Sequence, residues 1–518
     1  MVRAGPPGHR LMVGRLLAYW ARHRAARLRA SPPLATPEVK AAPLTGLQGW
    51  IATDPYPAYE SALLCADSLR QQAATALAAG IDLAFAQQNL QQLIERAPSA
   101  VIDRMLFAEV LLVQGQSERG CAALREVADN PGRISARAAV VLAEQAYCAG
   151  HFVQAAQYIG RAARDASDSM ACQIMLGRIC DIQGLHAKAL EHFRLAVAAQ
   201  PTVVVTRVYV ATALICMGEL AAGLTEWVEA ETRGGLYRFE AACPVWDGQP
   251  LEDARLLILT HSGFGDVIQF IRFARHLRAR APRARLSVLV RPALASLMRA
   301  SGLFEAVHSG QVDSQDADWQ ITQTHLPLVL GLQMRDLQGF SSYLQAPAPL
   351  AQAAASWLPS REPGCLRVGL RWAGAPGPFD AKRSVPLALL KSWFDIPGVQ
   401  WVGLAEDRAS AGAAAHEFGV LDVSAHLGDF CATAALMGQL DLIISVDTSC
   451  AHLAGALNLP TWLIAPPDAD WRWGRTGPAT PWYGSVRVFR HPPGADLDWP
   501  VVVREIEAAL RSRLALPG

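Results

Sequence analysis

The stretch that decides the fold is LDLIISVDTSCAHLAGA, residues 440–456, in the last third of the chain. Its apolar, β-rich run at 442–446 is short enough for a strand that is covered on both faces. Residues 447–449 are types that begin helices, and 451–457 is helix-forming. In α/β proteins, a strand whose carboxyl end opens on free helix N–H groups binds anions such as phosphate. The stretch therefore predicts an anion-binding strand–helix turn.

Similar patterns of strand and helix alternate around this stretch from residue 255 onward. Such alternation predicts parallel sheets, with ligands bound outside the carboxyl ends of the strands. We expect two βα domains, about 236–355 and 356–518, that face each other across a cleft. Their predicted strands span 256–260, 286–290, 319–321, 367–372, 400–404, 442–446 and 460–464, their helices span 267–281, 293–301, 387–394 and 430–440, and 346–355 has the character of a loop.

An internal repeat occupies residues 57–235. Its turn glycines lie 35, 35, 34 and 34 residues apart, and each stands between two helical patterns. This period resembles tetratricopeptide repeats, most closely at 184–201, and predicts a stacked α-helical solenoid. A concave surface for a protein partner is the expected function, and mere support for the next domain is the alternative. The glycines are Gly80, Gly115, Gly150, Gly184 and Gly218.

Composition excludes several classes of protein. The 518 residues are 51% hydrophobic and 18% charged with a formal net charge of +1, so we expect folded domains and no nucleic-acid partner. The ten cysteines form no CxxC pair, which favours reduced thiols in a cytoplasmic protein and no metal site. No apolar run reaches membrane-spanning length. There is no GxSxG, HExxH or Walker A sequence, which lowers the odds of hydrolase, zinc-protease and P-loop functions.

The first 56 residues form a basic lead-in and linker with seven arginines between Arg3 and Arg29. Residues 10–29 could make an amphipathic helix that touches an anionic membrane surface weakly, which would place the protein at the periphery of the inner membrane. The alternative is a poorly ordered tail.

A glycine-containing turn follows the first strand of the α/β region. Gly263 and Gly265 would let the backbone approach an anionic ligand, and Asp266 would stand at the start of the next helix. The alternative is a helix-capping aspartate. The turn lacks the GxGxxG spacing of a dinucleotide site.

Two further groups could carry chemistry. Lys382 and Arg383 follow the loop after the strand that ends at Trp372, where two cations could neutralise a diphosphate. His452 lies five positions after Asp447 and could face the same ligand, or it could be a structural histidine. The loop 468–473, with two tryptophans flanking an arginine, could stack on a base or sugar or pack a domain interface.

Together these stretches resemble the glycosyltransferase family 9 (heptosyltransferase-like) domain, and more closely bacterial proteins that join tetratricopeptide repeats to it. The resemblance rests on 263–270 (GFGDVIQF), 368–374 (VGLRWAG), 382–386 (KRSVP) and above all 441–456. It implies a GT-B fold, two Rossmann-like domains facing a cleft, whose C-terminal half binds most of a nucleotide-sugar donor. It also implies an inverting, metal-independent transfer.

The resemblance implies roles for particular residues. Asp266 matches the base that takes a proton from the acceptor hydroxyl. Either Lys382 or Arg383 matches a basic residue near the donor phosphates, and Glu406 or Asp407 is placed to hold a ribose. The donor-binding set comprises Gly263, Gly265, Trp372, Lys382, Arg383, Glu406, Asp447, Thr448, Ser449 and His452.

The leading hypothesis is a cytoplasmic glycosyltransferase that needs no cofactor beyond its nucleotide-sugar substrate, with the repeats presenting a protein acceptor or partner. A tetratricopeptide scaffold with a catalytically degenerate transferase domain is the second hypothesis. A sugar transferase of the lipopolysaccharide type with an auxiliary repeat region is the third.

Overall fold

The computed structural model describes residues 68–80, 82–234, 243–310, 317–337, 342–374, 380–405 and 408–515. The basic lead-in, with its expected membrane contact at 10–29, and Glu406 with Asp407 lie outside these residues. The chain divides into two compact units, Met1–Cys180 with Lys188–Tyr209, and Asp181–Ala187 with Val210–Gly518. The division falls before the end of the repeat pattern, so the last repeat helix belongs to the same unit as both sheets.

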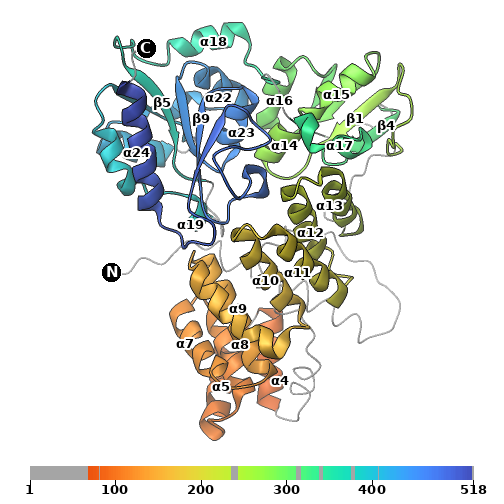
Figure 1. Ribbon diagram of the computed structural model, residues 1–518, viewed down its shortest axis with the longest axis vertical. Coiled ribbons are helices and arrows are strands. Elements are labelled where there is room, and N and C mark those ends of the chain that lie inside the picture. The colour runs from red at the N-terminus through yellow and green to blue at the C-terminus, as the bar shows by residue number, and fades with distance from the viewer. Residues whose placement is uncertain are drawn as a thin grey trace. The chain divides into compact units, whose positions relative to one another are not determined.

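The repeat region consists of helix pairs, as the 34- to 35-residue period predicts (Figure 1). All five turn glycines have positive φ, between 66° and 90°, a conformation that glycine adopts without steric cost. The two helices of the last pair also pack closely, because a Cβ at Gly223 would lie 2.5 Å from Ile215 Cγ1. The helices are α4 (Ser68–Ala79), α5 (Leu83–Arg96), α6 (Val101–Val113), α7 (Ser117–Ala128), α8 (Arg133–Cys148), α9 (Phe152–Ala166), α10 (Met170–Ile182), α11 (His186–Ala199), α12 (Val205–Cys216) and α13 (Leu220–Gly234).

Ion pairs link the first helices of successive repeats. Each joins an arginine to an acid about one repeat away, and the Glu144 carboxylate is only 1% exposed. A buried charge is tolerated when its partner is held at close range, and it is costly when that partner is removed. The pairs, at 2.5, 2.8 and 2.6 Å, are Arg70–Asp103, Arg137–Glu109 and Arg178–Glu144, and they connect α4 to α6, α6 to α8 and α8 to α10.

The second unit contains two sheets in which every pairing is parallel. The strand orders are β3-β2-β1-β4 and β10-β9-β8-β5-β6-β7. In both sheets the first strand lies between the second and the fourth, which is the Rossmann arrangement that the family resemblance implies. The strands are β1 (Arg255–Leu259), β2 (Arg285–Leu289), β3 (Ala306–His308) and β4 (Trp319–Thr322), then β5 (Leu366–Arg371), β6 (Val399–Gly403), β7 (Leu421–Asp422), β8 (Leu442–Val446), β9 (Thr461–Ala465) and β10 (Val486–Arg490).

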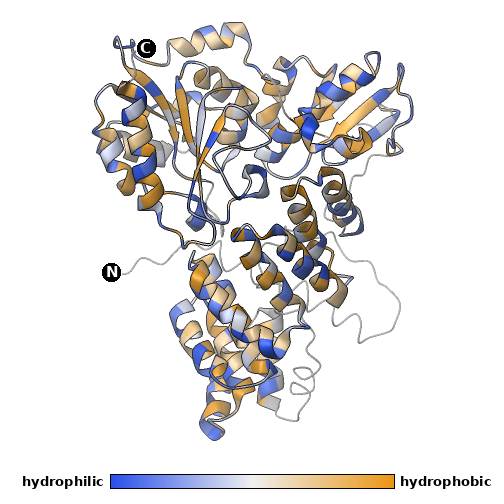
Figure 2. Cartoon of the chain, in the orientation of Figure 1, coloured by the Kyte–Doolittle hydropathy of each residue, from blue (hydrophilic) through white to orange (hydrophobic). Residues whose placement is uncertain are grey.

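Apolar residues concentrate in these strands, as Figure 2 shows. Strand β8 is buried along its whole length, and successive side chains enter different hydrophobic clusters. Ile443 packs with residues of α22 and α23, whereas Ile444 packs with residues of α24. The sheet is therefore covered on both faces, as the apolar run at 442–446 predicts.

Helices and short 3-10 turns complete the two sheet domains. The segment 346–355, expected to be a loop, mostly forms helix α18 (Ala348–Ala355), because its alanines favour a helix and Ala354 is fully buried. Among the described residues, no helix is long and apolar enough to cross a membrane. The other elements are α14 (Phe264–Phe270), α15 (Phe273–Arg280), α16 (Pro292–Ala300), α17 (Leu326–Val329), η2 (Met334–Leu337), α19 (Asp380–Arg383), η3 (Leu387–Leu390), α20 (Lys391–Phe394), α21 (Arg408–Phe418), η4 (Ser424–His426), α22 (Phe430–Met437), α23 (Ser449–Ala456), η5 (Trp471–Trp473) and α24 (Trp499–Ala515).

Candidate active site

Two strand-end turns lie at the centre of the candidate site. The turn after β1 leads into α14, where the Oδ2 atom of Asp266 accepts the backbone N–H of Gly263 at 2.8 Å. The turn after β8 leads into α23, and Asp447 stands where β8 neighbours β5. This neighbour pair is the point at which the strand order reverses, the usual place for a ligand in such sheets.

Arg472, in η5, joins the two turns. Its guanidinium lies 2.5 Å from Asp266 Oδ1 and 2.7 Å from Asp470 Oδ1, and its Nε donates to Gln269. Although burial alone lowers it, the pKa of Arg472 is raised above its ordinary value by the carboxylates of Asp470 and Asp266. Arg472 is thus a buried cation that connects the N-terminal and C-terminal sheet domains.

Asp447 is a third carboxylate beside this arginine. Burial and the negative charge of Asp470 raise the pKa of Asp447 to about 6, against the lowering influence of Trp473, Arg472 and Arg383. The site therefore holds an aspartate that changes charge just below neutral pH.

The two cations after β5 are both engaged within the protein. The Lys382 ammonium forms an ion pair with Asp468, and both side chains are largely buried. The Arg383 guanidinium lies against Gly374, where any Cβ would overlap it. Arg383 also lies close enough to Asp447 for its charge to lower the pKa of that aspartate, while the charge of Lys382 is already balanced by Asp468.

His452 occupies the position of a structural histidine. It is buried, its Nδ1 lies 2.9 Å from the Tyr483 hydroxyl, and its ring packs 4.8 Å from that of Trp473. A Cβ at Gly265 would lie 2.5 Å from His452 Cδ2. Gly265 therefore makes room for the contact between α14 and α23, and burial holds the pKa of His452 well below its ordinary value.

The remaining predicted residues lie near the turns. Thr448 is the N-cap of α23, and its hydroxyl lies 3.2 Å from that of Ser445. Ser449 is half-buried at the start of that helix. Trp372 belongs to the hydrophobic core of the C-terminal sheet, where its side chain is 7% exposed.

Sequence reasoning missed Arg472 and Asp470 as site residues. The aromatic rings of loop 468–473 predict stacking on a base or sugar as one alternative, but Trp471 and Trp473 are 5% and 0% exposed and cannot stack on a ligand. Trp471 instead packs against Trp482 and Trp227, with ring centroids 5.4 and 5.9 Å apart. The expectation that this loop packs an interface is confirmed. An arginine between two tryptophans was the only local signal.

One group of potential metal ligands occurs among the described residues. Ligand atoms of Asp181, His186 and Cys216 lie within 4.8 Å of one another. The Asp181 carboxylate is bonded to the Arg475 guanidinium at 2.5 Å, and burial raises the pKa of Cys216 to about 12. A neutralised carboxylate and a protonated thiol make a poor cation site.

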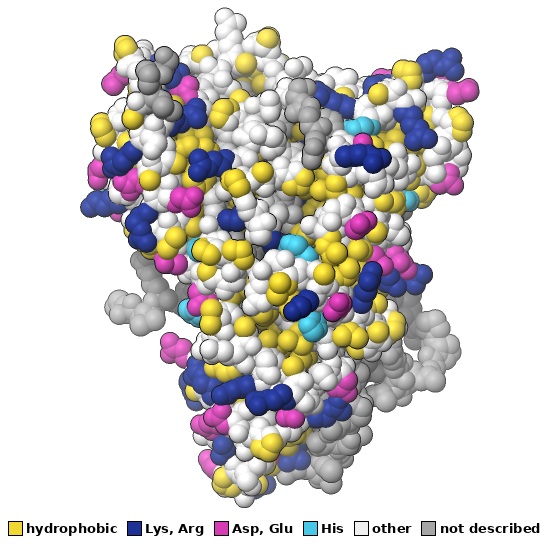
Figure 3. Space-filling model, viewed as in Figure 1, with side chains coloured by type: hydrophobic (Ala, Val, Ile, Leu, Met, Phe, Trp, Pro, Cys, Tyr) yellow, Lys and Arg dark blue, Asp and Glu magenta, His cyan; other side chains and the backbone are white. Residues whose placement is uncertain are grey.

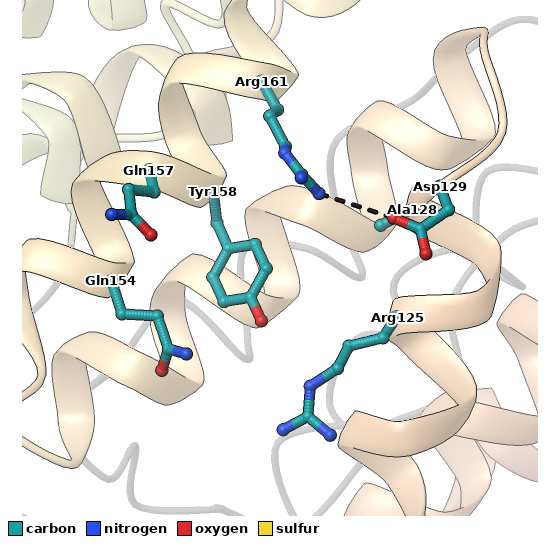
Figure 4. A pocket seen from close by; sticks show the side chains of 7 residues that line it. All are labelled: Arg125, Ala128, Asp129, Gln154, Gln157, Tyr158 and Arg161. Carbon is teal, nitrogen blue, oxygen red and sulfur yellow. Dashed lines mark hydrogen bonds and ion pairs between the residues drawn. The ribbon is translucent and has the colours of Figure 1, made fainter.

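The helical unit carries a cavity of its own. It has a volume of about 360 Å³ between α7 and α9, and Arg161 closes one side through an ion pair to Asp129 at 3.5 Å (Figure 4). On the face shown in Figure 3, acidic and basic side chains are interspersed. Neither view shows a surface of a single charge. The cavity is lined by Arg125, Ala128, Asp129, Gln154, Gln157, Tyr158 and Arg161.

Comparison with known proteins gives distant matches. No protein-family model matches the chain. Protein FlbA of Caulobacter vibrioides is 27% identical over 316 residues, 54% of this chain, and the chain spans about half of that relative's length (50%).

Solved structures give weak likenesses. A glycosyl transferase family 9 protein from Veillonella parvula is 12% identical with a TM-score of 0.36, covering 51% of this chain and 91% of that one. ADP-heptose lps heptosyltransferase II of E. coli is 16% identical with a TM-score of 0.35, covering 50% and 100%. A crystal structure of MamA is 15% identical with a TM-score of 0.28, covering 33% and 95%. At these scores, the strand orders and helix pairs of the chain itself define its fold.

Proposed function

We propose that this chain is a glycosyltransferase that moves a sugar from a nucleotide-sugar donor to a hydroxyl acceptor, with inversion and without a metal. One observation carries the proposal: Asp266 and Asp447 follow the first strand of one Rossmann sheet and the fourth strand of the other, and both lie beside Arg472. Each sheet has an aspartate just after the carboxyl end of one of its strands, and this arrangement suits a reaction between two substrates, one bound at each sheet.

The proposed step is a single displacement at the sugar's C1 atom. Asp266 takes the proton of the acceptor hydroxyl as its oxygen attacks C1, and the bond from C1 to the phosphate oxygen breaks. The nucleoside diphosphate leaves with the bonding electrons. Arg383 and the N–H groups at the start of α23 would stabilise its charge. Arg472 and Gly263 each bond one Asp266 oxygen, which fixes the direction of the remaining lone pairs.

A panel of nucleotide sugars tests the donor site by thermal shift. We expect one of them to raise the melting temperature of the wild type and to lose that effect in Asp447→Ala. Asp441→Asn is the matched control, since Asp441 lies before β8, at its opposite end, and pairs with Arg361 at 2.5 Å. If none of the nucleotide sugars stabilises the wild type, the donor-site proposal fails.

Asp266→Ala tests the proposed base. We expect the variant to keep the donor-induced shift and to lose transfer, because the residue acts on the acceptor and not on the nucleotide. Unchanged turnover would remove Asp266 from the mechanism.

We further propose that the repeats present a protein acceptor or partner to the sheet domains. Stacked helix pairs provide an extended surface of the kind that binds protein segments. Pull-down with the full chain, repeated with Arg125→Glu in the cavity of Figure 4, would show whether that cavity belongs to the surface. If the wild type and Arg125→Glu capture the same amount of partner, the cavity is excluded from the binding surface.

A scaffold with a degenerate transferase domain is the second candidate function. It is favoured by the ion pairs Arg472–Asp266 and Lys382–Asp468, which engage candidate catalytic and phosphate-binding groups within the protein itself. This candidate predicts partner binding that no nucleotide sugar alters, whereas a transferase predicts that Asp266→Ala removes product.

A further inference from the structure

The switch point of the N-terminal sheet, between β1 and β4, is occupied by a side chain from the last repeat helix. Glu231 of α13 is 5% exposed there. Its Oε2 accepts the Thr324 hydroxyl at 2.7 Å, and its Oε1 accepts the indole N–H of Trp227 at 2.8 Å. A place that usually receives a ligand is therefore taken by a carboxyl group of the chain itself.

His261, which closely follows β1, faces the same carboxyl group. Its Nε2 lies 3.5 Å from Glu231 Oε1 and 3.4 Å from the Thr324 hydroxyl. Its Nδ1 lies 2.7 Å from the hydroxyl of Ser262. Both facing side chains are nearly enclosed, at 5% exposure for His261 and 6% for Glu231. In the part of the chain that the structure describes, no lysine or arginine forms an ion pair with Glu231.

Burial shifts the pKa values of these two groups in opposite directions. Burial, with the nearby Asp266 carboxylate, raises the pKa of Glu231 to about 7, although Thr324 and Trp227 lower it. Burial lowers the pKa of His261 to about 4. Each group avoids its charged form because charge is costly away from water. Between about pH 5 and 6.5, the enclosed pair thus holds close to one proton and little net charge.

The turn between His261 and Asp266 adjoins this pair. Ser262 has a φ of 73°, which is unusual for a residue other than glycine, and its backbone carbonyl accepts a bond from Arg291 at 3.1 Å. The next residue, Gly263, donates its N–H to Asp266. A strained backbone persists only where its surroundings hold it, and His261 is the side chain that ties this turn to α13.

We propose that Glu231 and His261 share a single proton across the switch point, and that this pair positions the turn that carries Asp266. The last helix of the repeat region is then a structural part of the candidate active site. The consequence for transfer rests on the proposed function, whereas the shared proton does not.

The proposal has a distinctive consequence for opening of the turn to water. On opening, Glu231 regains an ordinary carboxyl pKa and releases a proton, while His261 regains an ordinary imidazole pKa and takes one up. Between about pH 5 and 6.5 the two effects cancel, so the wild-type turn should open with little dependence on pH. When either side chain is removed, opening of the turn should become dependent on pH through titration of the side chain that remains.

Hydrogen exchange of the full chain, corrected for intrinsic rates, tests this in a peptide spanning 260–267. In Glu231→Gln, protection should rise about tenfold per pH unit from pH 5 to 6.5, because only His261 titrates. In His261→Gln, protection should fall about tenfold per pH unit from pH 5 to 7, because only Glu231 titrates. The wild type and the double variant should be nearly flat. Glu229→Gln, on the same helix but paired with Arg233, is the matched control and should behave like the wild type.

Opposite slopes in the two single variants, together with a flat wild type, show that the enclosed pair holds one proton in total. Single variants with the wild-type profile overturn it. If Glu231→Gln unfolds the turn at every pH, the slope of His261→Gln alone decides. The experiment uses no nucleotide sugar, so it can be interpreted even if the transferase proposal fails. If the wild type transfers sugar but protection in both single variants is independent of pH, the shared proton alone is refuted.

Discussion

Replacing Asp447 by asparagine should stabilise the unliganded protein at neutral pH. Burial and Asp470 raise the pKa of Asp447 from 3.8 to about 6, so the folded state holds this proton more tightly than the unfolded chain does. The free energy of unfolding therefore falls as the pH rises from about 4 to about 6, and the loss is complete above that range. A shift of about 2 units corresponds to a loss of about 3 kcal/mol at pH 7.

Asparagine removes this loss because it carries no charge at any pH. It leaves Arg472 paired with Asp266 and Asp470, so the substitution strands no cation. We expect the melting temperature of the unit that holds both sheets to rise by roughly 6 °C at pH 8, taking about 2 °C per kcal/mol for a domain of this size. At pH 5 the gain should be roughly half as large, because only about half of the free-energy loss from ionising Asp447 has accumulated at that pH.

The assay is thermal unfolding at pH 5 and pH 8, followed by near-ultraviolet circular dichroism, which the many tryptophans of this unit dominate. Asp441→Asn serves as the control, since Asp441 bonds Arg361 and the backbone N–H of Arg367, and its loss should lower the melting temperature. A melting temperature of Asp447→Asn at or below that of the wild type at pH 8 would refute the reasoning. So would a gain of equal size at both pH values.

Three further substitutions test other parts of the structure. Arg472→Met leaves the surrounding carboxylates without their common cation and should cost about 3–5 kcal/mol of stability, measured as a lower melting temperature of the same unit. Glu144→Ala strands the buried guanidinium of Arg178 and should destabilise the helical unit by about 3–5 kcal/mol, with hydrogen exchange rising in α8 and α10 first. Gly265→Ala places a methyl group against His452 and should cost about 1–3 kcal/mol, a loss that His452→Ala in the same chain should partly restore in thermal melts.

Local patterns account for the elements that the sequence predicts well. Strand β8 spans the predicted residues 442–446, because its apolar run is bounded by Asp441 and Asp447. The repeat turns follow from glycines at a fixed period, whose positive φ the structure shows. Strands β3 and β7, of three and two residues, carry too few side chains for any period to show, and β10 was missed as well.

The centre of the site depends on contacts that no local pattern encodes. Arg472 meets Asp266 from 206 positions away in the sequence, so its burial follows from how two sheets are brought together. Glu231 sits in an ordinary helical repeat and has the sequence context of a solvent-facing glutamate. Its contacts with His261 and Thr324, 30 and 93 residues later, show that it is enclosed. Turns at strand ends can be predicted from sequence, whereas the residues that reach them from elsewhere cannot.

The ion pairs between successive repeats restrict how this solenoid can change. Glu144 needs an arginine in the repeat that follows, and Asp103 needs one in the repeat before it. Deleting, duplicating or exchanging a single repeat would leave an unpaired charge in a buried contact between repeats. The energetic cost would be a large fraction of the free energy of unfolding of a typical domain. These repeats are therefore not interchangeable modules. Each has a fixed neighbour, and lengthening the array would require a matched acid and arginine to be introduced together.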